Sequence, residues 1–193
     1  MTNLKGRKMI IPIIIVAIAV IFVVLLYNSL VVKKNQVNNA FAGTDALLKK
    51  RYDLIPNLVE TVKTYMQHEQ KTLTEITEMR SKAMSGPLSD DDKIDLNNKL
   101  GKAVGGIMVA VENYPDLKAN QNFMQLQGSL NEIEEQISAA RRAYNASVTD
   151  YNNAVEMFPT NILASMMNYK QRKLFETAES ERQNVNVGSL FKN

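Results

Sequence analysis

Few side chains in this sequence could act as acids, bases, nucleophiles or metal ligands. The chain has one histidine, His68, and no cysteine. A di-iron bundle needs two Glu-x-x-His motifs, but the residue three positions before His68 is Tyr65. A Ser-His-Asp triad would need a serine in a turn such as Gly-x-Ser-x-Gly, which does not occur. Because Gln67 and Glu69 flank His68, we interpret this histidine as part of a solvated helix face.

Carboxylates are the remaining candidates for chemistry. An enzyme would depend on a metal site made of carboxylates alone, for which Asp45, Glu60 and Glu69 are the best candidates. A second acidic cluster, residues 90–92, directly follows Ser89. Serine at an N-cap and carboxylates in a first turn stabilise a helix start, so capping explains this cluster better than a cation site does. The sequence therefore predicts neither an enzyme nor a cofactor.

The formal net charge of +3 comes from the N-terminus and not from the body of the chain. Lys5, Arg7 and Lys8 are three of the 23 basic residues, and all 20 acidic residues follow the apolar stretch at residues 9–32. The remaining chain thus carries equal numbers of both signs. A neutral body with interspersed charges lacks the basic surface that nucleic acids require, so we exclude nucleic acid as a partner.

Residues 9–32 form an uncharged stretch that predicts a membrane anchor. Its centre is almost wholly branched aliphatic, and about 20 apolar residues suffice for a helix to cross the hydrocarbon core. A cleaved signal peptide is the alternative, but its apolar region spans about 7–15 residues, and here no small-x-small cleavage site follows directly. We predict an uncleaved single span, with the lipid bilayer as its partner.

The charges that flank this stretch predict its orientation. Lys5, Arg7 and Lys8 precede the span, whereas only Lys33 and Lys34 follow it closely. The positive-inside rule then favours a cytoplasmic N-terminus and a body outside the cytoplasm. We expect the inner membrane of a bacterium, and the opposite orientation stays open.

Apolar residues at spacings of three and four predict an all-α fold. No helix-breaking dipeptide follows the anchor, so we expect one long helix, or two nearly coaxial ones, from the bilayer to about Asp53. Pro56 disfavours helical geometry at the residue before it, so we expect the chain to turn there and to begin a second helix. Glu69 interrupts the stripe of this second helix, either at its edge or paired with a cation. The stripe consists of Val59, Val62, Met66, Leu73, Ile76 and Met79.

Two further long helices complete the pattern. The third opens at Ser89 and runs to Tyr114, and it carries Gly101 and Gly105, whose spacing suits close approach of a neighbouring helix. The fourth, at about 120–157, has a coiled-coil-like seam. The seam consists of Phe123, Leu126, Leu130, Ile133, Ile137, Ala140 and Tyr144.

Beyond the fourth helix the pattern weakens. Phe158-Pro159 ends that helix, and Thr160 with Asn161 can cap a short helix through Met166. We interpret the polar residues 176–193 as a mobile tail. The sequence predicts a transmembrane helix followed by an elongated antiparallel bundle of about four long helices. The expected boundaries are 1–8 for the basic flank, 9–32 for the anchor, 33–175 for the bundle and 176–193 for the tail.

Several separated motifs resemble the LemA family, in that family's order. They cover about residues 27–175. They are Phe41-Ala42, Asp45, Leu48, residues 50–63, His68-Glu69, residues 114–120 with Phe123, residues 140–145, Tyr151-Asn152 and Phe158-Pro159. The resemblance implies a bacterial membrane protein with one N-terminal span and a bundle of long helices, and it implies no established reaction. The family's short N-terminus is usually placed outside the cell, whereas the flanking charges here favour the reverse.

The charged members of these motifs are candidates for a structural or interaction network. They are Asp45, Arg51, Asp53, Glu60, Glu69, Arg141, Arg142 and Asn145. We expect Asp45 or Glu60 to pair with Arg142 and so to set the register between neighbouring helices. A recognition groove for a partner segment is the alternative.

Long helices, a neutral surface and no convergent catalytic set favour a non-enzymatic scaffold or adaptor at the membrane. Its protein partners are not specified by the sequence, and a homo-oligomer is one possibility. A membrane-tethered sensor that binds a peptide or lipid between its helices is the alternative. An unfilled apolar cavity would favour the sensor.

Overall fold

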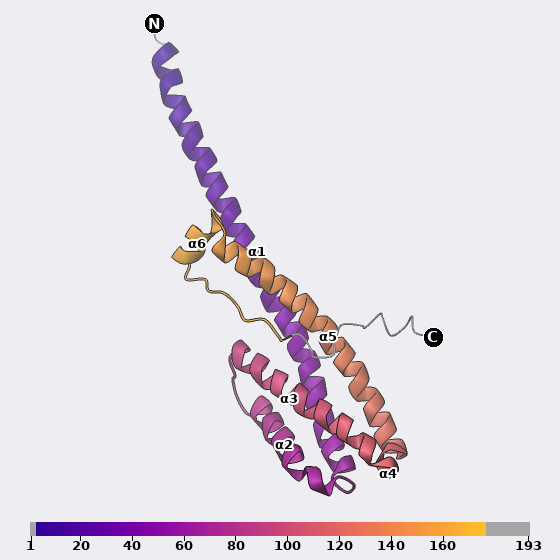
Figure 1. The fold of residues 1–193 in the computed structure, drawn as a ribbon. Coiled ribbons are helices and arrows are strands. Elements are labelled where there is room, and N and C mark those ends of the chain that lie inside the picture. The colour runs from indigo at the N-terminus through magenta and orange to yellow at the C-terminus, as the bar shows by residue number, and fades with distance from the viewer. Residues whose placement is uncertain (1–2, 177–193) are drawn as a thin grey trace, which may run out of the picture. The chain divides into compact units, whose positions relative to one another are not determined.

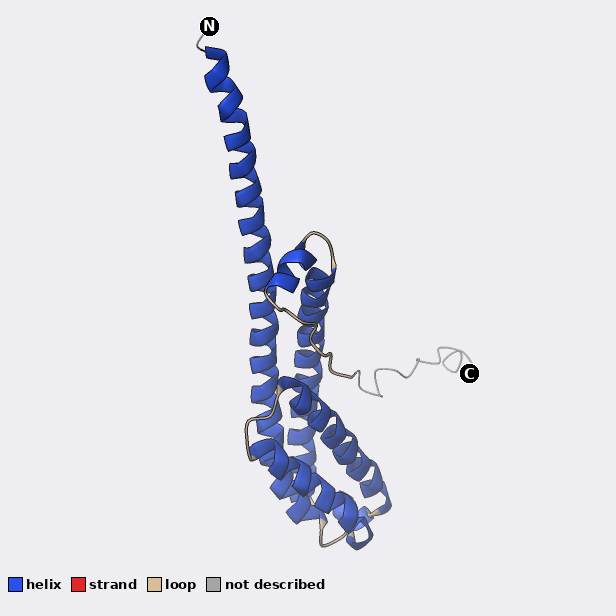
Figure 2. Cartoon of the chain, turned by 90° about the vertical axis from the view of Figure 1, so that its left-hand side faces the viewer, coloured by secondary structure: helices blue, strands red, loops and turns tan. Residues whose placement is uncertain are grey.

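A computed structural model describes residues 3–176, and every regular element in that range is a helix (Figure 2). The helices are α1 (Asn3–Val62), α2 (Gln70–Met84), α3 (Asp90–Ala110), α4 (Pro115–Lys118), α5 (Gln121–Glu156) and α6 (Thr160–Met166) (Figure 1). Two single 3-10 turns, η1 (Gln67–Glu69) and η2 (Val111–Asn113), join some of them. The predicted all-α bundle is confirmed. The predicted mobile tail, beyond Glu176, lies outside the described residues.

The chain forms two compact units. Unit 1 comprises Met1–Phe41 and Ala146–Arg172, and unit 2 comprises Ala42–Asn145 and the segment that begins at Lys173. Both α1 and α5 contribute to each unit because each helix contains a boundary.

Unit 2 has a continuous apolar core to which four helices contribute. The end of α1, both α2 and α3, and the start of α5 supply its buried side chains, as the predicted stripes require. Met66, Val111 and Leu117 fill the core from the connecting segments. The helical members are Leu48, Tyr52, Ile55, Leu58, Val62, Leu73, Ile76, Leu100, Val104, Ile107, Phe123, Leu126, Leu130, Ile133 and Ile137.

The predicted turn at Pro56 is wrong, because α1 continues through the proline to Val62. Proline lacks the N–H that would bond to the carbonyl four residues earlier, here that of Tyr52. Arg80 on α2 replaces the missing donor, since its Nε lies 2.8 Å from the Tyr52 carbonyl oxygen. The buried side chains of Ile55 and Leu58 hold both sides of the proline in the core. Tertiary packing thus overrides the local preference.

The real break comes later than predicted. The carbonyl of Val62 accepts bonds from the amides of Tyr65 and Met66, at 3.0 and 2.9 Å, and α2 begins only at Gln70. Met66 is fully buried in this connection and fixes the reversal of the chain. The predicted second helix is therefore divided between the end of α1 and α2. No glycine or proline marks the division, because it follows from burial.

Two of the helices, α3 and α5, begin with side-chain caps. Ser89 accepts the amide of Asp92 at 3.1 Å and caps α3, as predicted. The Asn120 side chain accepts the amides of Asn122 and Phe123 at 2.9 and 3.2 Å before α5. The predicted cap of α6 is wrong, because no side chain caps that helix and the Thr160 hydroxyl instead donates to the Met157 carbonyl.

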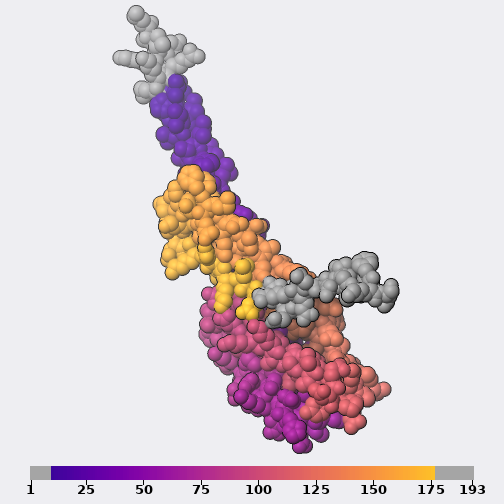
Figure 3. Space-filling model, in the orientation of Figure 1, coloured from indigo at the N-terminus to yellow at the C-terminus, as the bar shows by residue number. Residues whose placement is uncertain are grey.

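Unit 1 combines an exposed apolar helix with a packed corner. An 18-residue window of α1 has a mean hydropathy of 3.3 and no buried residue, so the helix is long and apolar enough to cross a membrane. Farther along α1, Leu30 and Val37 are buried. Figure 3 shows the end of α5 and α6, coloured orange to yellow, against α1 at this level. Within unit 1, α1 therefore passes from an exposed apolar part to a part whose side chains are buried against the protein.

Candidate functional site

The most buried charged side chain in unit 2 is Arg51, on the core-facing side of α1. Its side chain is 0% exposed. Its Nη1 lies 2.7 Å from Glu134 Oε1 on α5, and its Nη2 donates to the backbone carbonyl of Asn97 on α3, at 3.3 Å, and to the Asn97 side-chain oxygen. The guanidinium therefore joins three helices. Its planar fork of donors suits such a junction better than a lysine ammonium would.

Gly101 leaves the space that this junction occupies. A Cβ atom at Gly101 would lie 3.4 Å from Arg51 Nη1 and 3.9 Å from Arg141 Nη2. We call Arg51, Asn97, Gly101, Glu134 and Arg141 the Arg51 cluster. The predicted close approach of a neighbouring helix is seen at neither glycine. A Cβ at Gly101 would meet only these two side-chain ends, and a Cβ at Gly105 would meet nothing within 4 Å.

Tyr52 lies next to Arg51 in the sequence, and the pKa of its hydroxyl is shifted. Burial raises the pKa of the Tyr52 hydroxyl above its ordinary value of 10.0. The positive charge of Arg51 lowers this pKa, Asp45 raises it and Arg141 lowers it, in decreasing order of effect. Because desolvation dominates, Tyr52 keeps its proton to higher pH than a solvated tyrosine does.

The predicted pairing with Arg142 is wrong. Asp45 instead binds Lys93 on α3, with Nζ at 3.0 Å from each carboxylate oxygen. Glu60 pairs with Lys63, three residues away, at 3.6 Å. Arg142 is exposed, and its Nη1 lies 2.9 Å from Ser138 Oγ on its own helix. Helices are linked instead by Asp45–Lys93 and by Arg51–Glu134. Arg51 lies on the buried stripe of its helix, whereas Arg142 is exposed.

Asn145 and Arg141 hold a segment of the chain itself. We call residues 173–176 the C-terminal strap. The Asn145 side-chain amide donates to the Phe175 carbonyl at 3.1 Å and accepts the Phe175 amide at 2.9 Å. The buried Phe175 ring lies edge-on to Tyr144, with centroids 5.2 Å apart, and 5.4 Å from the Arg141 guanidinium. The partner segment at these two predicted residues is therefore the strap.

The strap also reaches α3. Lys173 Nζ lies 2.5 Å from Asp95 Oδ1, and Glu176 accepts Lys102 at 3.0 Å. The hydrogen bond to Asp95 raises the pKa of Lys173 above its ordinary value of 10.5. These exposed pairs fix position more than they add stability.

The remaining predicted residues do not join a site. Asp53 and His68 are exposed, as predicted for His68, and Glu69 is half-buried in η1. Within residues 3–176, no three side chains of histidine, aspartate or glutamate gather to hold a metal ion. Asp45, Glu60 and Glu69, the three carboxylates that a metal site would have needed, are therefore not brought together.

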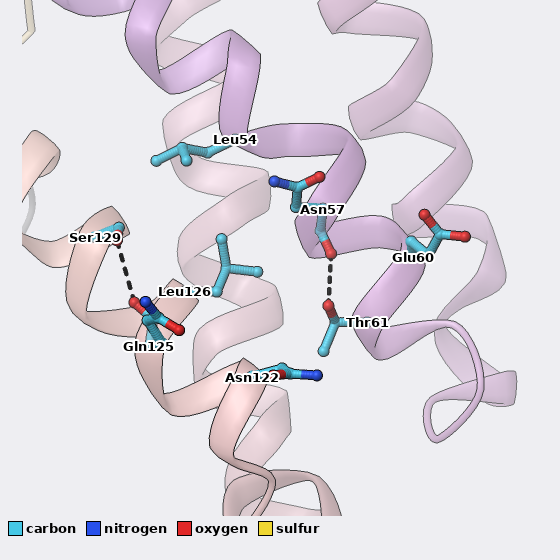
Figure 4. Close-up of a pocket in the computed structure, with 8 residues that line it drawn as sticks. All are labelled: Leu54, Asn57, Glu60, Thr61, Asn122, Gln125, Leu126 and Ser129. Carbon is cyan, nitrogen blue, oxygen red and sulfur yellow. Dashed lines mark hydrogen bonds between the residues drawn. The ribbon is translucent and has the colours of Figure 1, made fainter.

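An open groove lies elsewhere in unit 2, between the end of α1 and the start of α5 (Figure 4). Its volume is about 360 Å³. Leu54 and Leu126 give it apolar area, while the rest of its lining is polar. The Thr61 and Ser129 hydroxyls bond to carbonyls of their own helices, at 2.7 and 3.1 Å. The other lining residues are Asn57, Glu60, Asn122 and Gln125.

Several residues of these sites were missed in the sequence. Asn97 and Glu134 in the cluster, and Lys93 beside Asp45, were not predicted. One signal was available, because Asn97 and Gly101 lie in step with the apolar residues of α3. A polar residue and a glycine one turn apart on a buried stripe predict a polar side chain arriving from another helix.

The family comparison decides what kind of protein carries this geometry. A model of the LemA family matches residues 40–188, which is more than half of the chain. The chain belongs to the LemA family. The predicted resemblance is thereby confirmed, and the residues of the Arg51 cluster, the strap and the groove all lie within the matched LemA range.

Individual relatives support this assignment to LemA. Protein LemA of Metamycoplasma hominis is 28% identical over 163 residues, covering 84% of this chain and 74% of the relative. Magnetosome protein MamQ 2 of Paramagnetospirillum magneticum is 21% identical over 175 residues, covering 78% and 64%. Magnetosome protein MamQ of Magnetospirillum gryphiswaldense is 21% identical over 174 residues, covering 77% and 64%. This LemA-family chain thus spans less than two thirds of the two magnetosome proteins.

Proposed function

We propose that the protein is a non-enzymatic, membrane-anchored scaffold or adaptor that presents a protein-interaction surface at a bacterial membrane. One observation carries the proposal. The first part of α1 is bare and apolar, whereas its last part supplies five buried side chains to the core of unit 2. One helix therefore serves both as the anchor and as a structural element of the bundle. A bundle that shares a helix with its membrane anchor in this way is suited to holding an interaction surface at a membrane.

The groove of Figure 4 is the surface that we propose for a partner. Asn57, Asn122 and Gln125 line it with side-chain amides, each of which can donate and accept hydrogen bonds. Such amides can pair with the backbone of an unpaired peptide segment. Glu60 adds one carboxylate, so a segment with a basic residue fits better than an acidic one. A partner protein with an exposed, extended segment is the occupant that this lining favours.

The proposal that the protein is non-enzymatic is supported by the contacts that its charged side chains make. Asp45 is engaged by Lys93, Glu60 by Lys63, and the buried Arg51 by Glu134 and Asn97. These contacts hold helices or strengthen single turns. Two of the three carboxylates considered for a metal site, Asp45 and Glu60, thus have structural partners.

We propose that the anchor lies in the inner membrane, with the bundle outside the cytoplasm. Lys5, Arg7 and Lys8 before the span outnumber Lys33 and Lys34 after it. The chain has no cysteine, so the exposed Lys82 on α2 can become one clean thiol as Lys82→Cys. A membrane-impermeant maleimide should label this variant in intact cells with a permeable outer envelope. Protection until lysis would place the bundle inside.

The scaffold itself is tested by comparing the partners of two full-length variants. Asn57→Arg with Gln125→Arg blocks the groove, and Thr74→Arg with Ser81→Arg makes the same charge change on the exposed face of α2. Each is purified from membranes in mild detergent, and its companions are quantified by mass spectrometry. We expect a set of companions that the wild type and the α2 variant share and the groove variant loses. An unchanged set in the groove variant would contradict the role of the groove. A set made only of further copies of the chain would indicate a homo-oligomer.

A membrane-tethered sensor is the second candidate, and the groove favours its peptide form over its lipid form. An acyl chain needs an apolar cavity, whereas this groove is open and its lining is mainly polar. A sensor differs from a scaffold because its occupant is a free peptide. Displacement of groove-dependent companions by short basic peptides would support the sensor.

A further inference from the structure

The corner between α5 and α6 in unit 1 exposes more apolar surface than a soluble corner needs. Phe158 is 79% exposed, Met166 78%, Met157 62% and Ile162 55%. All four lie within ten residues of the chain. In unit 2, by contrast, the exposed large hydrophobic side chains are scattered singly, on Tyr65, Met84, Val109, Met124 and Leu174. Clustered exposed apolar side chains mark a contact surface, while single ones need no explanation.

The exposed apolar side chains of α6 share one outward face. Ile162 and Met166 lie one helical turn apart on this helix, and the exposed Phe158 lies just before it, in the turn that follows α5. Ala164, on the other side of α6, is fully buried. The segment from Met157 to Tyr169 carries no charge. The corner therefore has an inner face that packs and an apolar outer face without a protein partner in the described part of the chain.

The position of this corner along α1 identifies what covers it. Tyr169, just after α6, lies against Lys34, with Nζ 4.7 Å from the ring centroid. Lys33 and Lys34 are the first charges after the apolar stretch, so they mark the headgroup level of a spanning helix. Figures 1 and 2 both show α6 beside α1. The corner thus lies at the depth where the span leaves the bilayer.

Burial on α1 extends this contact toward the membrane. Leu30 is 0% exposed, although Tyr27 and Val32 on either side of it are about half exposed. Leu30 precedes Lys34 by four residues, or about 6 Å along the helix. Leu30 is therefore packed against protein about one helical turn closer to the proposed membrane than Lys34.

We propose that the α5–α6 corner is a second membrane contact, in which Phe158, Ile162 and Met166 enter the interfacial region of the same bilayer that α1 spans. Amphipathic segments of this kind lie with their apolar face about 5–10 Å into the boundary between headgroups and acyl chains. Lys33, Lys34 and the exposed Lys170 flank the corner and suit anionic headgroups. The contact would fix the tilt of α1 in the bilayer. The inference rests on the proposed membrane anchor.

The chain has no tryptophan, so a single indole can report the surroundings of each position. Full-length Phe158→Trp and Met166→Trp are placed, one copy per disc, in nanodiscs of phosphatidylcholine and phosphatidylglycerol. Two variants serve as matched controls. They are Phe22→Trp in the span and Met124→Trp at an exposed apolar position in unit 2. Emission is recorded with lipids brominated either near the headgroup or near the chain end. Far-UV circular dichroism confirms that all four variants keep the helical content of the wild type.

We expect blue-shifted emission at positions 158 and 166 that is quenched more by bromine near the headgroup. Position 22 should be quenched by bromine near the chain end, and position 124 by neither. Red-shifted, unquenched emission at positions 158 and 166, with quenching at position 22, would overturn the inference and leave the anchor intact. Blue-shifted but unquenched emission would mean that protein covers the corner, and it would overturn the inference too. Loss of quenching at position 22 would overturn the anchor itself.

Discussion

Arg80 Nε lies 2.8 Å from the carbonyl oxygen of Tyr52, the helix carbonyl that Pro56 leaves without an amide partner. The bond comes from α2, so a side chain from a second helix supports the proline in the first. It explains why α1 runs unbroken to Val62. A side chain of α2 thus supplies the hydrogen-bond donor that the proline removes from α1.

This relationship predicts an energetic coupling between Arg80 and Pro56. Arg80→Met should lower the free energy of unfolding by about 1–2 kcal/mol, because it leaves the part-buried carbonyl unpaired. In a Pro56→Ala background the backbone amide of residue 56 is available to that carbonyl, so the same substitution should cost about 1 kcal/mol less. The measurement is a double-mutant cycle from thermal or denaturant unfolding of the full chain in detergent. Equal costs in both backgrounds would show that the bond does not serve the proline.

The Arg51 cluster predicts an unequal cost for its two charged partners. Glu134→Ala leaves a fully buried guanidinium without its carboxylate and should cost about 3 kcal/mol, discounted because Glu134 is itself 40% exposed. Arg51→Met removes the buried charge together with its bonds and should cost less, about 1–2 kcal/mol. Arg142→Met, on the exposed side of α5, is the matched control and should change stability by less than about 0.5 kcal/mol. A cost at Arg142 equal to that at Glu134 would contradict this assignment.

Gly101 and Gly105 predict opposite responses to a large side chain on the same helix. Gly101→Leu should push against the guanidiniums of Arg51 and Arg141 and cost about 1–3 kcal/mol. Gly105→Leu meets nothing within 4 Å at its Cβ and should raise stability by about 0.5–1 kcal/mol, through helix propensity. Thermal unfolding of both variants gives the comparison. Equal effects would mean that Gly101 does not set the space for the cluster.

Tyr52 predicts a loss of stability at alkaline pH. Its pKa in the folded chain is raised by burial, so between about pH 10 and that value the unfolded state has released a proton that the folded state keeps. The free energy of unfolding therefore falls as pH rises through this window, and the contribution is fully present below about pH 10. Lys173, whose pKa is also raised, acts in the same direction from about pH 10.5. Tyr52→Phe should flatten this alkaline slope, as measured by denaturant unfolding of the full chain at a series of alkaline pH values, and an unchanged slope would contradict the role of Tyr52.

The helices of this chain are predictable because their apolar residues are regularly spaced. The predicted position of the first break is wrong because it follows from one local signal, Pro56. The buried stripe of α1 passes through Leu48, Arg51, Ile55, Leu58 and Val62 in alternating steps of three and four. That rhythm crosses Pro56 without a change of phase, which is the signal for a continuous helix. Pro56 by itself predicts a break, whereas the donor that replaces its amide, on Arg80, lies 28 residues after Tyr52 and leaves no local signal.

The candidate site was only partly predictable, for a related reason. Arg51 lies in phase on the buried stripe of α1, so its burial could be read from the sequence, whereas Arg142 lies one residue off the line of Ile137 and Tyr144. Its partners Glu134 and Asn97 depend on which helix faces which, and spacing within one helix does not contain that information. The strap was missed because Phe175 follows a polar, weakly patterned stretch, and only the Asn145 side chain reveals its place.

The central claim is that a membrane-anchored bundle presents its groove to a protein partner, and crosslinking in living cells tests it most directly. A photoreactive phenylalanine replaces Gln125 in the groove or, as the control, Ser81 on the exposed face of α2. After irradiation, membranes are separated on a denaturing gel and the chain is detected by an epitope tag. The account predicts one or a few discrete, membrane-associated adducts from position 125 that position 81 does not give. No adduct from position 125, or the same adducts from both positions, would contradict it.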